Sequence, residues 1–321
     1  MNSLLDQFVL KLQTTTLDPC LPYGGAAYHY TSLQSIDSIL LRENGARLWA
    51  SRHDCLNDVS EGTLSELRFE QACTRLRESG KITEGFFDLI NGVRSNRTDL
   101  FITFPQNDKV KLVRGEYKTY IISLSEDSDA LAMWNYYSKG SRNEGANIGI
   151  DIQAMVASLK LDGKIKGKDV KTRGIVKVRA VKVIYDEDEQ VGIIERSLLD
   201  LSRNYSRGQE TSVRSCIGML LAHLKPVFKL DYFAHEKEVR LIVDIVDKFQ
   251  DEIAVKYRSN AGFMIPYIEL DFDKTAVKSI TLGPTLGDVY QKESQRSVVR
   301  EMMESYGYQA VADSSNIPVR Y

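Results

Sequence analysis

The apolar positions of this chain predict short strands and helices that follow one another in an irregular order. Apolar residues at every second position are typical of a half-buried strand, and a spacing of three and four is typical of a helix with one buried face. Strands are expected at 26–30, 47–51, 117–125, 147–152, 175–185, 236–243, 253–258, 264–271 and 277–283. Helices are expected at 3–13, 32–43, 60–78, 82–93, 127–137, 190–223 and 288–306. Because no βαβ unit repeats along the chain, this order favours an α+β fold.

Turn-forming residues divide the chain into a short N-terminal part and one long domain. Prolines and a glycine pair follow the first helix, so residues 1–25 are expected to form a helix and a loop. The remaining residues, 26–321, are expected to form a single domain with helical insertions. Within it, Thr31 or Ser32 is expected to cap the helix that follows the first strand.

The composition is that of a globular protein without a strong overall charge. The 321 residues include 42 Lys and Arg against 44 Asp and Glu, and 43% are hydrophobic. A net charge of −2 creates no global field that would attract nucleic acid or a membrane surface. The stretch 160–182 is an exception, because it holds nine lysines and arginines and therefore forms a local basic patch.

Cysteine usage and hydropathy favour a cytoplasmic protein. The four cysteines are scattered, with no Cys-x-x-Cys pair that would indicate a zinc site, and this fits a reducing compartment. No apolar run is long enough to span a bilayer, and the first residues lack the basic and apolar regions of a signal peptide. We therefore expect no membrane partner and no bound metal.

A line of charges, Glu236, Glu238 and Arg240, precedes an apolar run. In a strand these three side chains share one face. Charges beside a buried strand are costly unless they pair or take part in chemistry. One interpretation is a charge ladder on an edge strand, in which Arg240 neutralises Glu238. The other is a positioned carboxylate that stabilises a developing sugar cation, as in the cleavage of a glycosidic bond.

A second group of candidate residues surrounds His29, at the end of the first predicted strand. Its neighbours Tyr28, Tyr30 and Thr31 offer hydroxyl groups, and a helix is expected to begin directly after them. His29 is either a neutral imidazole that hydrogen-bonds a substrate hydroxyl or a structural histidine satisfied by backbone groups.

Two further motifs allow both a structural and a ligand-binding interpretation. Asp58 and Glu61 are spaced as the start of a helix, which leaves Asn57 without an evident structural role. Trp134 and Tyr136 fall on one predicted helix, where aromatic residues either pack in the core or stack on a planar ligand.

Taken in order, these motifs resemble a widespread bacterial family of unknown function. The resemblance is carried by Tyr-His-Tyr-Thr-Ser (28–32), Leu-Trp-Ala-Ser (48–51), Leu-Asn-Asp (56–58), Ser-Leu-Ser-Glu (123–126), Met-Trp-Asn-Tyr-Tyr (133–137), Glu-Lys-Glu-Val-Arg (236–240) and Ile-Thr-Leu-Gly-Pro (280–284). The same order is similar, more distantly, to that of ADP-ribosyltransferases. This second resemblance implies a split, mixed or antiparallel sheet core with peripheral helices, and NAD as a substrate.

The transferase resemblance also implies a role for each candidate residue. Glu238 is the expected catalytic carboxylate, Glu236 is its partner, and His29 orients the NAD ribose. The residues implied to bind NAD are His29, Tyr30, Thr31, Trp49, Ser51, Asn57, Trp134, Tyr136 and Arg240. The chain departs from the family pattern because Trp49 and Ser51 stand where one subclass has a tyrosine, so the subclass stays open.

The function implied is the transfer of ADP-ribose from NAD to a macromolecule, which is RNA, DNA or protein. Such an enzyme would be a toxin restrained by an antitoxin protein, or an anti-phage defence effector. Two other functions remain open. One is a magnesium-dependent nuclease that uses Asp58, Glu61, Glu236 and Glu238, and the other is a non-catalytic, ligand-binding regulatory module. The transferase hypothesis requires His29 and Glu238 to face one cavity.

Overall fold

The computed structural model covers the predicted domain and parts of the N-terminal segment. The described residues are 4, 7–8, 23–55, 63–94, 100–106, 109–115, 117–137, 145–161, 176–246, 253–260, 262–284 and 289–318. Most of the helix expected at 3–13 and most of the basic stretch 160–182 lie outside these residues. The motif residues Asn57, Asp58 and Glu61 lie outside them as well.

The described elements alternate between strands and helices without a repeating unit. The strands are β1 (Ala26–Thr31), β2 (Ala46–Arg52), β3 (Leu100–Gln106), β4 (Lys109–Gly115), β5 (Tyr117–Ser125), β6 (Ala146–Asp151), β7 (Lys160–Leu161), β8 (Val176–Lys182), β9 (Glu238–Val246), β10 (Lys256–Asn260), β11 (Phe263–Phe272), β12 (Val277–Leu282) and β13 (Val311–Ser314). The helices are α2 (Ile36–Leu40), α3 (Leu64–Glu78), α4 (Glu84–Ile90), α5 (Leu131–Tyr137), α6 (Ile152–Ser158), α7 (Glu187–Asn204), α8 (Glu210–Leu224) and α9 (Val289–Ser305). Short 3-10 turns are η1 (Leu33–Ser35), η2 (His53–Cys55), η6 (Asp231–Glu236) and η8 (Lys274–Ala276).

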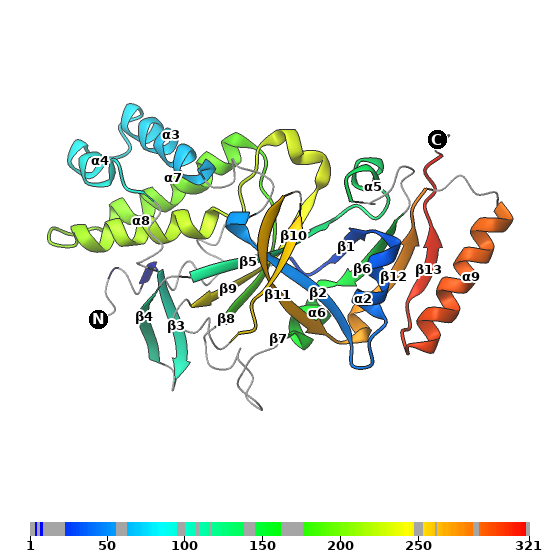
Figure 1. Cartoon of the computed structure of the whole chain (residues 1–321). Helices are drawn as coiled ribbons and strands as arrows, with labels where there is room; N and C mark the ends of the chain where they lie inside the picture. The colour runs from blue at the N-terminus through cyan, green and yellow to red at the C-terminus, as the bar shows by residue number, and fades with distance from the viewer. Residues whose placement is uncertain are drawn as a thin grey trace.

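The main sheet branches at β5, near the middle of the molecule (Figure 1). One edge of β5 pairs with β9 along its whole length, and β9 pairs with β8. The opposite edge pairs with β2 at Tyr120 and Ile121, but with β1 only at Ser125. The backbone of 122–124 therefore has no strand partner on this edge among the described residues. We call this opening the fork.

Two arms of the sheet diverge from the fork. The β2 arm continues through β11 to β10, and the β1 arm continues through β6 and β12 to β13. The described strand pairs of both arms are antiparallel except β12 with β13, which are parallel. The protein is therefore a mixed α and β fold around an open, mixed sheet, as the irregular order of elements predicts.

Apolar cores cover the two faces of the central strands. Helices α3, α4, α7 and α8 pack over Ile121 of β5 and Ile242 of β9, and Figure 1 shows them as a layer on one side of the sheet. Leu4 and Phe8, which precede the domain in sequence, join this core. The opposite face buries Leu124 and its neighbours against residues of α2, α6 and α9. Because β9 is covered on both sides, any charge it carries on a face is enclosed by protein.

Most predicted strands are confirmed, and the departures have local causes. The helix expected at 190–223 is two helices, because the chain turns at Gly208 with a φ of 93°. Neither Thr31 nor Ser32 caps α2, since a 3-10 turn intervenes and the Ser32 hydroxyl bonds the Ser35 hydroxyl instead (2.9 Å). Strands β3, β4 and β13 were not expected. Among the described residues, no helix is both long and apolar enough to cross a membrane.

Candidate functional site

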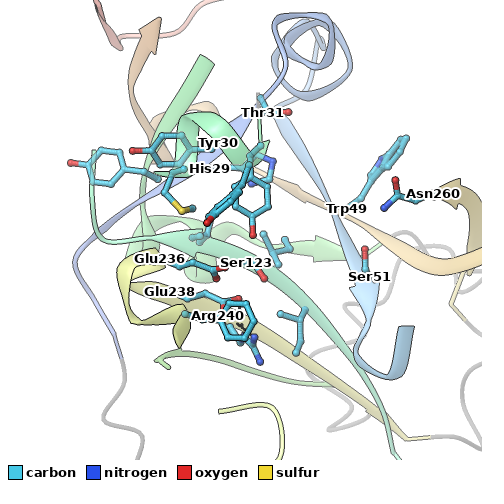
Figure 2. A pocket seen from close by; sticks show the side chains of 18 of the residues that line it. His29, Tyr30, Thr31, Trp49, Ser51, Ser123, Glu236, Glu238, Arg240 and Asn260 are labelled. Carbon is cyan, nitrogen blue, oxygen red and sulfur yellow. Dashed lines mark hydrogen bonds and ion pairs between the residues drawn. The ribbon is translucent and has the colours of Figure 1, made fainter. Parts of the chain in front are cut away.

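A cavity of about 970 Å³ lies at the fork, between the two arms and the 3-10 turn before β9. This volume is within the range of about 300–1,000 Å³ found for small-molecule sites. Its lining comes from β1, β2, β5, β9 and β10, together with η6 and α5. Figure 2 shows eight candidate residues of the sequence motifs gathered around it: His29, Tyr30, Thr31, Trp49, Ser51, Glu236, Glu238 and Arg240. His29 and Glu238, which are far apart in the sequence, both line this cavity.

Glu238 is held by two cations inside the protein. Arg240 forms a bidentate pair with it, from Nε to Oε1 (2.8 Å) and from Nη2 to Oε2 (2.9 Å). Lys229 lies 3.2 Å from Oε2 of Glu238 and 2.7 Å from Oε2 of Glu236. All four side chains are buried, and Arg240 also donates to the Pro226 carbonyl (2.9 Å). The charges form a paired cluster of two carboxylates and two cations, which we call the ion cluster.

The ion cluster keeps Glu238 ionised. Burial by itself raises the pKa of this carboxyl, but the charge and hydrogen bonds of Arg240, with contributions from Lys229 and Ser123, lower it to about 2. The backbone N–H of Glu238 donates to the Tyr185 hydroxyl (2.9 Å). Glu238 is therefore a fixed negative charge at neutral pH, positioned by partners on three other segments.

Glu236 reaches the cluster from a turn and not from the strand. It ends η6, and β9 begins only at Glu238, because Lys237 adopts a left-handed conformation with φ 43° and ψ 50°. The sequence predicted that Glu236, Glu238 and Arg240 share one face of a strand. This is correct for Glu238 and Arg240, which lie on β9, but wrong for Glu236, which lies on the turn before it. Ser125 fixes this turn by donating to the Glu236 carbonyl (2.7 Å).

His29 approaches the same cavity from β1, on the far side of β5. Burial lowers its pKa to about 4, opposed by a hydrogen bond to the Ser123 backbone and strengthened by the charge of Arg258. The imidazole is therefore neutral at pH 7. Its buried Nδ1 has no hydrogen-bond partner among the described residues. With the ring proton on the nitrogen that faces Ser123, Nδ1 is an acceptor for a ligand hydroxyl.

Ser123 connects the two sides of the site. Its backbone bonds His29, its hydroxyl bonds Glu238, and Figure 2 shows it between them. Neighbouring strands are about 4.8 Å apart, so β1 and β9 lie about 10 Å apart where both pair with β5 at Ser125. A ligand of dinucleotide size can therefore contact both His29 and Glu238.

The β2 arm contributes a cation and an aromatic surface. Arg258 on β10 donates from Nη2 to the Ser51 hydroxyl (2.8 Å), and Asn260 follows two residues later on the same strand face. Trp49 stacks on Tyr267, with ring centroids 4.5 Å apart, and remains 42% exposed. Trp49 and Ser51 thus line the cavity as expected, whereas Arg258 and Asn260 come from a strand that the motifs did not include.

Of the predicted aromatic residues, Trp134 lies away from the cavity, whereas Tyr30 and Tyr136 line it. Trp134 is fully buried, donates from Nε1 to Asp129 (2.8 Å) and does not line the cavity, so it has no exposed face for a ligand ring. It packs edge-on against Tyr30 (4.7 Å between centroids). Tyr30 and Thr31 line the cavity, but the Tyr30 hydroxyl already donates to the Asp127 carbonyl (2.7 Å). Tyr136 (60% exposed) and Tyr137 (39% exposed) both line the cavity, so two aromatic residues at the end of α5 are available to a ligand.

Several residues of the site were missed by sequence reasoning. Lys229 was missed because it lies two residues before η6 and belongs to none of the motifs. Its sequence context gives a signal, since a lone lysine among apolar residues (Val227-Phe228-Lys229-Leu230) indicates a buried, paired charge. Arg258 and Asn260 share one strand face, which their spacing shows, but nothing near them in sequence connects this face to the motifs.

The arrangement combines a neutral hydrogen-bond acceptor with a fixed negative charge in one half-enclosed space. A carboxylate whose pKa is about 2 is a weak base, so Glu238 is better suited to stabilising a positive charge than to removing a proton. Among the described residues, no group of three or more His, Cys, Asp and Glu side chains is placed to hold a metal ion. In the ion cluster, Lys229 and Arg240 occupy the carboxylate oxygens that a cation would need.

Comparison with known proteins identifies one related family. Searches of curated proteins and of solved structures gave no match. The matching family model begins in α5 and ends in β9, so it includes the ion-cluster residues Glu236, Glu238 and Arg240 but neither His29 nor Arg258. Residues 133–241, about a third of the chain, match the family described as "Protein of unknown function (DUF2971)", which confirms over this stretch the resemblance to a family of unknown function.

Proposed function

We propose that the protein is an NAD-dependent ADP-ribosyltransferase that modifies a macromolecule. The observation that carries this proposal is the placement of His29 and the ionised Glu238 on one cavity, from opposite sides of β5. The branched sheet is consistent with the split sheet that the transferase resemblance implies. The nicotinamide–ribose bond breaks through an oxocarbenium-like state, and a buried anion stabilises such a state strongly.

In the proposed reaction, each residue has a separate task. Nδ1 of neutral His29 accepts a hydrogen bond from a ribose hydroxyl and orients the sugar. Glu238 faces the ribose as positive charge develops, and Arg240 keeps it ionised. The C1′–N bond breaks, nicotinamide leaves, and an oxygen or nitrogen of the acceptor bonds to C1′ and loses its proton. Because Glu238 is a weak base, we assign acceptance of this proton to Glu236.

The rival metal-dependent nuclease has less structural support. It needs Glu236 and Glu238 as magnesium ligands, and both are bound by Lys229 or Arg240. Its other two carboxylates, Asp58 and Glu61, lie outside the described residues. The ligand-binding module remains a distinct alternative, because a polar pocket binds a ligand without catalysing a reaction. It predicts that Glu238→Gln leaves the cellular effect of the protein intact.

The acceptor is proposed at the level of its class, as RNA, DNA or protein. The basic stretch 160–182 suggested phosphate contacts, but the described cations within it have partners inside the protein. Lys182 pairs with Glu126 (2.7 Å), and Arg179 donates to the His223 carbonyl (2.9 Å). A toxin restrained by an antitoxin, or an anti-phage effector, is the biological role that we propose for such a transferase.

The decisive experiment uses NAD labelled in its adenylate part. Wild type, Glu238→Gln and His29→Asn are each incubated with labelled NAD and with total RNA, DNA and protein, and both label transfer and nicotinamide release are measured. We expect transfer by the wild type to one acceptor class, and a loss of at least about 100-fold in each variant, since removing one electrostatic contact to a transition state costs about that much.

A matched control separates chemistry from folding. Glu84→Gln removes an exposed carboxylate that pairs with Arg77 far from the cavity, so it should leave transfer unchanged. Because Glu238→Gln perturbs the ion cluster, its folding is checked by circular dichroism, and His29→Asn tests the site outside the cluster. Absence of both transfer and nicotinamide release from folded wild type, beside an active control enzyme, would contradict the proposed function.

A further inference from the structure

Among the residues that the structure describes, one cation that lines the cavity has no counter-charge. Lys229 and Arg240 are neutralised by Glu236 and Glu238 in the ion cluster. Arg258, by contrast, bonds only the Ser51 hydroxyl, and no carboxylate of the described residues lies within ion-pair distance of it. A half-buried guanidinium that faces a cavity with only a neutral partner favours an anionic ligand there.

Arg258 also has an unused donor. Its Nε is buried and has no hydrogen-bond partner among the described residues. A buried N–H group without an acceptor is costly, and it is satisfied when a ligand supplies an oxygen. Nδ1 of His29 also has no partner among the described residues, and His29 lines the same cavity. The β2 arm therefore offers a donor, Nε of Arg258, and the β1 arm offers an acceptor, Nδ1 of His29.

The surroundings of Arg258 define what kind of anion fits. The hydroxyl of Ser51 and the amide of Asn260 lie on the same side of the cavity and can bind phosphate oxygens. Trp49 is on the same face of β2 as Ser51, and Tyr267 covers one face of its indole. The exposed part of Trp49 therefore offers a stacking surface to a planar ring. Figure 2 shows Trp49, Ser51 and Asn260 on the side of the cavity away from Glu238.

We propose that Arg258, Ser51 and Asn260 bind the phosphates of a nucleotide, and that Trp49 stacks on its base. This inference rests on the proposed function, because it places the ADP part of NAD on the β2 arm and leaves the nicotinamide ribose between His29 and Glu238. The fork is thus divided into a binding side, formed by β2 and β10, and a reacting side, formed by β1 and β9.

The test uses ADP, which has the phosphates and the base but lacks the nicotinamide–ribose bond that the proposed reaction breaks. Binding of ADP and of adenosine to wild type, Arg258→Gln and Arg258→Lys is measured by calorimetry. We expect Arg258→Gln to weaken ADP at least about tenfold and to leave adenosine unchanged, because a charge-assisted hydrogen bond to phosphate is lost. Arg258→Lys should lie between the two, since it keeps the charge but not the planar donor pair.

Tryptophan fluorescence tests the stacking part of the proposal. The chain has two tryptophans, and Trp134 is fully buried. ADP should therefore quench the emission of Trp49, and Trp49→Phe should abolish the quenching and weaken both ADP and adenosine. Arg77→Gln serves as the matched control, because it removes an exposed arginine outside the cavity and should change nothing.

Several outcomes would overturn the subsite. Wild type would fail to bind ADP, or Arg258→Gln would bind ADP as tightly as wild type does. Arg258→Gln would weaken adenosine as much as ADP, or Arg77→Gln would weaken ADP as much as Arg258→Gln does. The subsite and the proposed function fail separately. ADP binding that depends on Arg258, without any transfer from NAD, would support the subsite and reject the transferase. Transfer with unaltered ADP binding in Arg258→Gln would do the reverse.

Discussion

At the residue scale, Arg240 has the clearest structural consequence. Removing it in Arg240→Met leaves the Glu238 carboxylate buried with Lys229 as its remaining cation. We expect a loss of about 3–5 kcal/mol in the free energy of unfolding, the usual effect of breaking a buried ion pair. Adding Glu238→Gln to this variant should restore part of the loss, because the unpaired charge is gone. Urea denaturation of both variants measures this, and equal stability of the two would contradict the role of the pair.

The residues that could be predicted from the sequence are those whose partners are near in sequence. The Arg240–Glu238 pair follows from strand geometry, since alternate residues share a face. Lys229 and Arg258 could not be assigned to the site in the same way, because their positions depend on how distant segments pack. Trp134 shows the opposite error, since an aromatic residue on a helix gives no sign of whether it is buried or exposed.

At the element scale, the turn between η6 and β9 controls the geometry of both carboxylates. Lys237 has a left-handed conformation, which costs about 1–2 kcal/mol in a residue with a Cβ and more in a β-branched one. Lys237→Gly should therefore keep or raise stability, whereas Lys237→Val should be less stable than Lys237→Gly by at least about 1 kcal/mol. Thermal and urea unfolding of the two variants compare them directly. Equal stability of the two variants would mean that position 237 does not require a left-handed conformation, and would contradict the role given to this turn.

Element boundaries were predicted best where burial enforces the period of two. Strand β5 has the expected bounds. Both of its faces are covered, so alternate residues pack into the two different cores and the period of two is clear in the sequence. The hairpin of β3 and β4 was missed, since Pro105 weakens the strand pattern and the pair forms a sheet of its own. The break between α7 and α8 covers residues 205–209 and turns at Gly208, and such a short turn is not evident from helical periodicity.

At the scale of the whole molecule, the fork is the feature that periodicity could not supply. A strand pattern says which residues share a face, but it does not say which strands pair. The branch arises because β1 and β2 share one edge of β5 and diverge between Ile121 and Ser125. The transferase resemblance implied a split sheet, and the motifs at 28–32, 48–51 and 236–240 meet at the branch. The site is thus a property of the sheet topology, assembled from segments that no local pattern connects.

This topology leads to a prediction about how the two arms respond to a ligand. The proposed subsite places ADP on the β2 arm, so ADP should slow amide hydrogen exchange in 46–52 and 256–260 and leave 26–31, on the β1 arm, unchanged. The helical layer, represented by 187–204, does not line the cavity and should exchange as before. Hydrogen-exchange mass spectrometry with saturating ADP measures this, and Arg258→Gln at the same ADP concentration should lose the effect. Protection of 26–31 by ADP, or no protection of 46–52 and 256–260, would contradict the division of the fork into a binding side and a reacting side.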